Sequence, residues 1–182
     1  MSAALHRFTP IQRLLHWTTA VLVIAMLFIG VGMVSTVGRS YLSLVSIHRP
    51  LGAAILILTL LRLGVRLRRG SPPLPADLPW PMAFAAKATQ VVLYALLLAM
   101  PLVGWAMLSA GGYRVEMFGA FSLPPIVPHD AALHALLRQA HTLLAFALFG
   151  AILAHAGAAL FHGLVRRDGV FEAMAGGGDP TA

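Results

Sequence analysis

The sequence predicts an all-α integral membrane protein, a bundle of four spanning helices that forms one domain over residues 1–182. Hydrophobic residues make up 59% of the chain and charged residues only 10%, whereas soluble domains have about 45–50% and about 25%. The apolar residues also fall into four runs, each of which has the roughly 20 residues that a bilayer-spanning helix needs. There is no cysteine, which excludes disulfides, thiolate metal sites and iron–sulfur clusters.

The four spans are predicted over residues 11–37, 41–65, 85–110 and 133–164. The first is longer than the apolar core of a signal peptide and begins with Arg13 and His16, so it is expected to be retained. The second contains Pro50, which predicts a kink. The third contains Pro101, which membrane helices tolerate where neighbours satisfy the freed carbonyl group. After the fourth span, residues 168–182 are expected to form a flexible tail.

The basic residues are distributed unequally between the two ends of the spans. One end, which holds both termini, has nine: Arg7, Arg13, Arg62, Arg66, Arg68, Arg69, Lys87, Arg166 and Arg167. The other end has four: Arg39, Arg49, Arg114 and Arg138. Because basic residues gather on the cytoplasmic side of a membrane, both termini are predicted to be cytoplasmic. The same distribution explains the net charge of +7 without any nucleic-acid partner.

Three histidines lie on one face of the fourth span. His141 and His155 are 14 residues apart, and His162 follows after 7 more. At about 3.6 residues per turn, these steps return to nearly the same direction, and the first covers about 21 Å of helix. Imidazoles are costly in lipid, so such a stripe needs partners inside the bundle.

Histidines on the first two spans supply partners at matching depths. His16 lies near the cytoplasmic face, like His155, and His48 lies near the opposite face, like His141. Each pair is predicted to bind one haem iron from both sides, as neutral imidazoles do. Such an iron has no open position, which favours electron transfer over oxygen activation. The alternative is that these histidines only hydrogen-bond between helices, at about 1 kcal/mol or less each.

For three more residues, the sequence leaves two interpretations open. His162 is either an ordinary interfacial histidine or a hydrogen-bond donor or proton relay to a quinone beside the inner haem. Arg49 and Arg138 either bind haem propionates or attract an anion, or they are interfacial anchors.

The chain resembles the bacterial cytochrome b561 family over roughly residues 7–175. The resemblance lies in His16-Trp17, His48, the His141, His155 and His162 spacing, and the segments Leu93-Tyr94 and Met100 to Gly104. It implies a four-helix protein of the bacterial inner membrane that holds two b-type haems. Relatives include a superoxide oxidase, which passes electrons from periplasmic superoxide to ubiquinone, and this would place His162 at the quinone site. Where relatives have histidines near the start of the third span, this chain has Lys87 and Gln90.

The predicted function is therefore electron transfer from a periplasmic one-electron donor, preferably superoxide, through two haems b to ubiquinone. The four basic residues near the outer haem would steer an anion. One alternative is a cytochrome b subunit that docks a hydrogenase or dehydrogenase. Another is a transporter or structural membrane protein without a cofactor. The absence of carboxylates from the deep parts of the spans argues against an ion transporter.

Overall fold

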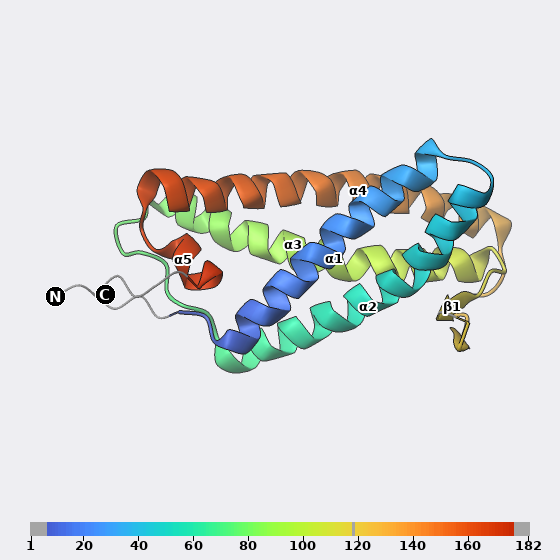
Figure 1. The fold of residues 1–182 in the computed structure, drawn as a ribbon, viewed down its shortest axis with the longest axis horizontal. Helices are drawn as coiled ribbons and strands as arrows, with labels where there is room; N and C mark the ends of the chain where they lie inside the picture. Colours follow the sequence, from blue (N-terminus) through green and yellow to red (C-terminus); the bar gives the residue numbers. More distant parts are fainter. Residues whose placement is uncertain (1–6, 118, 177–182) are drawn as a thin grey trace.

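Four long helices dominate the computed structural model, which describes residues 7–117 and 119–176 (Figure 1). They are α1 (Pro10–Ser35), α2 (Arg39–Arg69), α3 (Trp80–Ala110) and α4 (Ala131–Leu160). Each is long and apolar enough to cross a membrane. The predicted all-α bundle of four spanning helices is confirmed.

The helix ends lie within a few residues of the predicted positions, and local capping explains several of them. Thr9 accepts a hydrogen bond from the backbone of Gln12, and the Gln12 side chain accepts one from the backbone of Thr9. This reciprocal capping box starts α1. Asp130 caps α4 by accepting from the backbone N–H of Leu133. At its start, α3 includes Trp80 and Pro81, because proline suits the first turn of a helix.

The second helix remains helical through the buried Pro50. Its first turns bend away from the line of the rest of the helix (Figure 1). A proline ring removes one backbone hydrogen bond and clashes with the preceding turn, which is the usual cause of such a bend.

Short elements connect and follow the spans. The loop predicted between the third and fourth spans contains an antiparallel hairpin, β1 (Val115–Met117) paired with β2 (Phe121–Leu123). After α4, the chain continues as a π-helical segment, η1 (Phe161–Arg166), and then as α5 (Val170–Ala175). The short helix differs from the flexible tail expected from residue 168. Residues 177–182 lie outside the described residues.

The two ends of the bundle carry different connections. The α2–α3 loop and α5 lie at one end, and the hairpin lies at the other (Figure 1). The backbone N–H of Phe8 donates to the carbonyl of Ala173 over 3.2 Å, which ties the segment before α1 to α5. Both ends of the described chain therefore meet at the same side, as a bundle with an even number of spans requires.

Each helix contributes one residue to the centre of the bundle. Val23, Ile55, Leu97 and Leu148 form this central layer and are each 5–8% exposed. Large apolar side chains on the outer surface are exposed instead, for example Phe146 at 72%. An apolar exterior around a small apolar core is the pattern expected of a bundle in lipid.

Candidate functional site

The structure brings together both pairs of histidines that share a depth. His16 on α1 lies beside His155 on α4, with ring centres 6.2 Å apart and ring planes at 68°. His48 on α2 lies beside His141 on α4, with ring centres also 6.2 Å apart and planes at 67°. We call His16 and His155 the inner pair, and His48 and His141 the outer pair. All four side chains are half-buried.

The spacing of each pair matches two imidazoles bound on opposite sides of one metal ion. A metal–imidazole bond is about 2 Å long and the bound nitrogen lies about 1.1 Å from the ring centre, so two such rings have centres about 6.2 Å apart. Edge-to-face aromatic contacts cover the same range. The match gains its weight from the equal geometry of the two pairs and from the surroundings of the rings.

The outer pair has ring nitrogens that lack a partner. Nδ1 of His48 and Nδ1 of His141 are buried and have no hydrogen bond of good geometry to a described residue, although the backbone of Met100 lies close to the His141 ring. A buried polar atom left in this way costs about 1–3 kcal/mol. Gly104 on α3 makes room for one ring, because a Cβ there would lie 3.2 Å from Cε1 of His141. The outer pair is thus accommodated closely in the bundle.

The inner pair has a cation beside it. Arg62 on α2 donates from Nη2 to Nδ1 of His16 over 2.7 Å, and its guanidinium lies 5.4 Å from the centre of the Tyr94 ring. Among the described residues, no carboxylate forms an ion pair with Arg62. A guanidinium withdrawn from water without an anion is costly. The inner pair therefore lies next to an unmatched positive charge.

The central apolar layer separates the two pairs. Val23 follows His16 by seven residues, and Ile55 follows His48 by seven. Leu148 lies midway between His141 and His155, seven residues from each. Seven residues are about two helical turns, or roughly 10 Å. The bundle consequently has two levels that contain histidines, with an apolar level between them.

The residues present fit a haem at each pair. Across residues 7–117 and 119–176, no three His, Asp or Glu side chains come together as a metal-binding group. Each pair therefore offers an ion only two protein ligands. A haem iron takes its other ligands from the porphyrin and needs only two axial ones. Without cysteine, a haem here could not be attached covalently through thioethers, which excludes a c-type haem.

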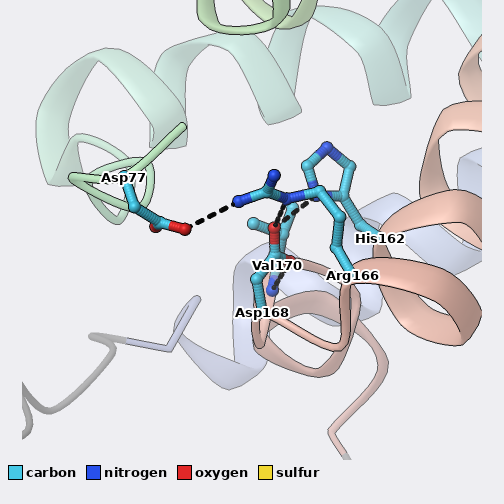
Figure 2. A network of polar contacts seen from close by, with 5 residues as sticks. All are labelled: Asp77, His162, Arg166, Asp168 and Val170. Carbon is cyan, nitrogen blue, oxygen red and sulfur yellow. Dashed lines mark hydrogen bonds and ion pairs between the residues drawn. The ribbon is translucent and has the colours of Figure 1, made fainter. Parts of the chain in front are cut away.

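His162 belongs to a separate polar network at the end of α4 (Figure 2). Its Nδ1 lies 2.7 Å from Oδ2 of Asp168. The same oxygen accepts from Nε of Arg166 over 2.8 Å, and Nη2 of Arg166 donates to Asp77 over 2.9 Å. The backbone N–H of Val170 donates to the other oxygen of Asp168.

Asp168 is ionised at neutral pH. Burial by itself raises the pKa of its carboxyl group, but the hydrogen bonds from Arg166, His162 and Val170 outweigh that effect and lower the pKa below its usual range. A carboxyl group with a lowered pKa in the folded state stabilises the fold above its unfolded pKa. That stabilisation is lost as the pH falls through the folded-state pKa.

The other candidate residues lie outside these contacts. Arg49 donates from Nη1 to the backbone carbonyl of Arg114 over 3.5 Å, and Arg138 is exposed near the start of α4. Neither guanidinium forms a hydrogen bond with His48 or His141 in the part of the chain that the structure describes. His134, also on the histidine stripe, donates from Nδ1 to the carbonyl of Met107 over 2.8 Å, so it has an ordinary structural partner.

Sequence reasoning missed two residues of these sites. The sequence places Arg62 near the end of the second span and counts it only among the nine basic residues of that side, although it precedes Arg66 by a full turn. Whether its long side chain then extends inward to the level of His16 depends on packing. Asp168 was assigned to the tail, and its nearness to His162 depends on the turn made by η1, which the sequence does not reveal.

Comparison with known proteins agrees with the fold. The profile of the family described as prokaryotic cytochrome b561 matches residues 7–177. Cytochrome b561 homolog 1 of Escherichia coli (strain K12) is 30% identical over 174 residues, covering 93% of this chain and 97% of that protein. Cytochrome b561 homolog 2 of the same strain is 30% identical over 175 residues, covering 93% and 92%. The probable superoxide oxidase CybB of Yersinia pestis is 32% identical over 174 residues, covering 92% and 95%.

The family match covers nearly the whole chain, and the relatives align over nearly their whole length. Four apolar helices and this family together indicate a multi-pass protein of the bacterial inner membrane. The family also implies b-type haem and a role in electron transfer. The chain belongs to the prokaryotic cytochrome b561 family.

Proposed function

We propose that the protein holds two haems b and carries electrons from superoxide at the periplasmic face to ubiquinone at the cytoplasmic side. One observation supports this most strongly: both histidine pairs have the same 6.2 Å separation, at two levels of one bundle. The probable superoxide oxidase of Yersinia pestis, which aligns along nearly all of the chain, supports the choice of donor.

The inner pair, His16 and His155, would hold one haem, and the outer pair, His48 and His141, would hold the other. A haem would supply one-electron chemistry. With two imidazoles as ligands, its iron would have no open position for a further ligand. The protein keeps the two levels apart by the apolar layer around Leu148. This arrangement favours electron transfer between levels over binding of oxygen at the iron.

The overall reaction balances with two donor molecules for each quinone. Two superoxide ions each lose one electron and leave as dioxygen. One ubiquinone takes up both electrons and two protons and becomes ubiquinol. The chain must therefore admit a small anion at one face and supply protons at the other.

The distribution of charge supports the direction of this transfer. The four basic residues on the outer side, which include Arg49 and Arg138, would attract an anion towards the outer pair. The nine basic residues on the other side favour cytoplasmic termini. A C-terminal reporter that functions only outside the cytoplasm is expected to stay inactive, and an active reporter would contradict this orientation.

Arg62 provides a further link to the inner haem. A guanidinium only donates hydrogen bonds, so Nδ1 of His16 acts as the acceptor in their contact. A haem carries two propionate carboxylates, and one of them would supply the anion that Arg62 lacks. With a propionate as the partner of Arg62, Nδ1 of His16 would be free to carry the ring proton, and Nε2 would then be the nitrogen that could hold the iron.

Replacing Arg62 with leucine is expected to lower the midpoint potential of the inner haem. A nearby cation stabilises the reduced haem, which carries one more electron than the oxidised haem. We expect about a tenfold fall in the ratio of reduced to oxidised inner haem at a fixed potential, or about 59 mV. A spectroscopic redox titration measures this shift. Arg68→Leu, which removes an exposed cation from the same helix, should leave both potentials unchanged, and an equal shift in both variants would refute the local role.

The choice of superoxide has a direct test. Superoxide generated enzymatically should reduce the haems of the purified protein within the mixing experiment, and added superoxide dismutase should abolish that reduction. Reduction that is no faster than in the dismutase control would remove superoxide as the donor. Co-purification of a stable dehydrogenase or hydrogenase in mild detergent would then favour a protein donor.

A further inference from the structure

The carboxylate of Asp168 is held firmly against His162. The His162 side chain is 11% exposed, and the Asp168 side chain is 9% exposed. Three donors converge on the carboxylate, from the His162 ring, the Arg166 guanidinium and the backbone of Val170. Arg166 also reaches Asp77 in the α2–α3 loop. The network thus joins the end of α4 to the neighbouring loop, and Asp168 lies at its centre (Figure 2).

This contact determines which nitrogen of His162 carries the proton. An ionised carboxylate only accepts hydrogen bonds, so Nδ1 of His162 must be the donor. In the neutral imidazole, Nε2 then has the free lone pair. Figure 2 shows the second ring nitrogen pointing away from the carboxylate, and no described residue forms a hydrogen bond with it. Nε2 is thereby left available to a molecule from outside the protein.

The backbone around His162 is unusual for a membrane helix. Residues Phe161–Arg166 form a π-helical segment, and Arg167 follows in the left-handed conformation with φ of 51°. Such π-helical turns are rare and frequently occur at functional sites. Leu164 and Val165 in the same segment are exposed at 67% and 68%. Leu164 and Val165 thus give this segment an apolar outer surface, while His162 in the same segment is buried.

The structure assigns Asp168 as a positioning residue that orients His162 and presents Nε2 for proton transfer to the quinone. This inference rests on the proposed function and deepens it. Protonated His162 gives the proton on Nε2 to a quinone oxygen as electrons arrive, and it regains a proton from cytoplasmic water. The second proton that the quinone needs comes from solvent. The charge of Asp168 stabilises the imidazolium between these steps, as in other carboxylate–histidine pairs.

Several other charged groups surround His162 and bear on its pH dependence. Arg166 in the same segment opposes a positive charge on the ring, and Asp77 partly offsets Arg166 from the α2–α3 loop. From α5, which packs against the segment, Glu172 has one carboxylate oxygen buried without a hydrogen-bond partner. On α4, His155 lies two turns earlier. Asp168 is the carboxylate in direct contact with the ring.

The test measures reoxidation of the haems by quinone, and it does not depend on which molecule donates electrons to the protein. The full-length protein is reduced with dithionite, excess reductant is removed, and a short-chain ubiquinone is mixed in while haem absorption is followed. Asp168→Asn should keep its haem content and slow reoxidation by about 10- to 100-fold. The pH profile of the rate should also differ from that of the wild type, because the amide carries no charge beside the His162 ring.

A double-variant comparison shows whether Asp168 acts through His162. His162→Ala should slow reoxidation to a similar extent, and His162→Ala with Asp168→Asn should be no slower than His162→Ala alone. Glu116→Gln removes an exposed carboxylate in β1, at the other end of the bundle, and should leave the rate near that of the wild type. Asp168→Glu keeps an anion and should recover part of the rate. If Asp168→Asn loses haem, the rate of Asp168→Glu decides whether the charge of Asp168 is needed.

Two results would overturn the inference. One is a haem-replete Asp168→Asn protein with the wild-type rate and pH profile, and the other is additive losses in the double variant. Failure of ubiquinone to reoxidise the wild-type haems would instead refute the proposed function, so the two failures are distinguishable.

Discussion

Replacing His155 with alanine is expected to remove the inner haem and leave the outer haem in place. The inner pair would keep only His16 as an axial ligand, while the outer pair, about 21 Å away along α4, would be unchanged. Haem per chain should fall by about half. Superoxide should still reduce the remaining haem, but the rate of quinone reduction should fall by more than about 100-fold. Loss of a residue that only orients a metal ligand costs about 10- to 100-fold in activity, and loss of the ligand itself should cost more. A pyridine haemochrome assay and steady-state kinetics measure both effects.

His134→Ala is the matched control for this variant. His134 lies on the same helix and on the same stripe, but its Nδ1 has the carbonyl of Met107 as its partner. This variant should retain both haems. If His155→Ala keeps its full haem content, the inner pair does not bind a haem. If His134→Ala loses as much haem as His155→Ala, the loss reflects damage to α4.

Replacing His141 with alanine should produce the complementary defect. The outer haem should be lost, because His48 alone remains of the outer pair. The inner haem should persist, and ubiquinone should still reoxidise it after reduction by dithionite. Reduction by superoxide should become slow, since the donor would have to pass an electron beyond the apolar layer around Leu148. Absorption spectroscopy of the dithionite-reduced protein, followed by stopped-flow mixing with each partner, separates these steps.

The two histidine variants together test the order of the transfer. Loss of superoxide-driven reduction in His155→Ala, with retention in His141→Ala, would reverse the assignment of the two faces. Loss of both haems in either variant would show that the two histidine pairs do not bind their haems independently.

The four helices and both histidine pairs can be predicted from the sequence, for physical reasons. Spanning helices require long apolar runs, and this requirement appears directly in the composition. The 14-residue separation of His141 and His155 is nearly four turns, so both rings project from one face regardless of the partner helices. Depth in the bilayer then predicts that His16 and His48 are the opposing residues.

The contacts of Arg62 and Asp168 were beyond such reasoning. An arginine side chain is long and flexible, so a residue at the end of a span can extend either outward to the interface or inward, as Arg62 does towards His16. Asp168 approaches His162 only because the chain adopts π-helical geometry and then turns at Arg167. Neither feature follows from periodicity, and both depend on packing against other helices.

The haem content of the purified wild-type protein tests the bis-histidine arrangement most directly. A pyridine haemochrome assay combined with a quantitative protein assay gives the number of haems b per chain. Two haems per chain, both low-spin as expected for imidazole ligands on each side of the iron, is the predicted result. A colourless protein, or a single haem that survives in both His141→Ala and His155→Ala, would contradict it.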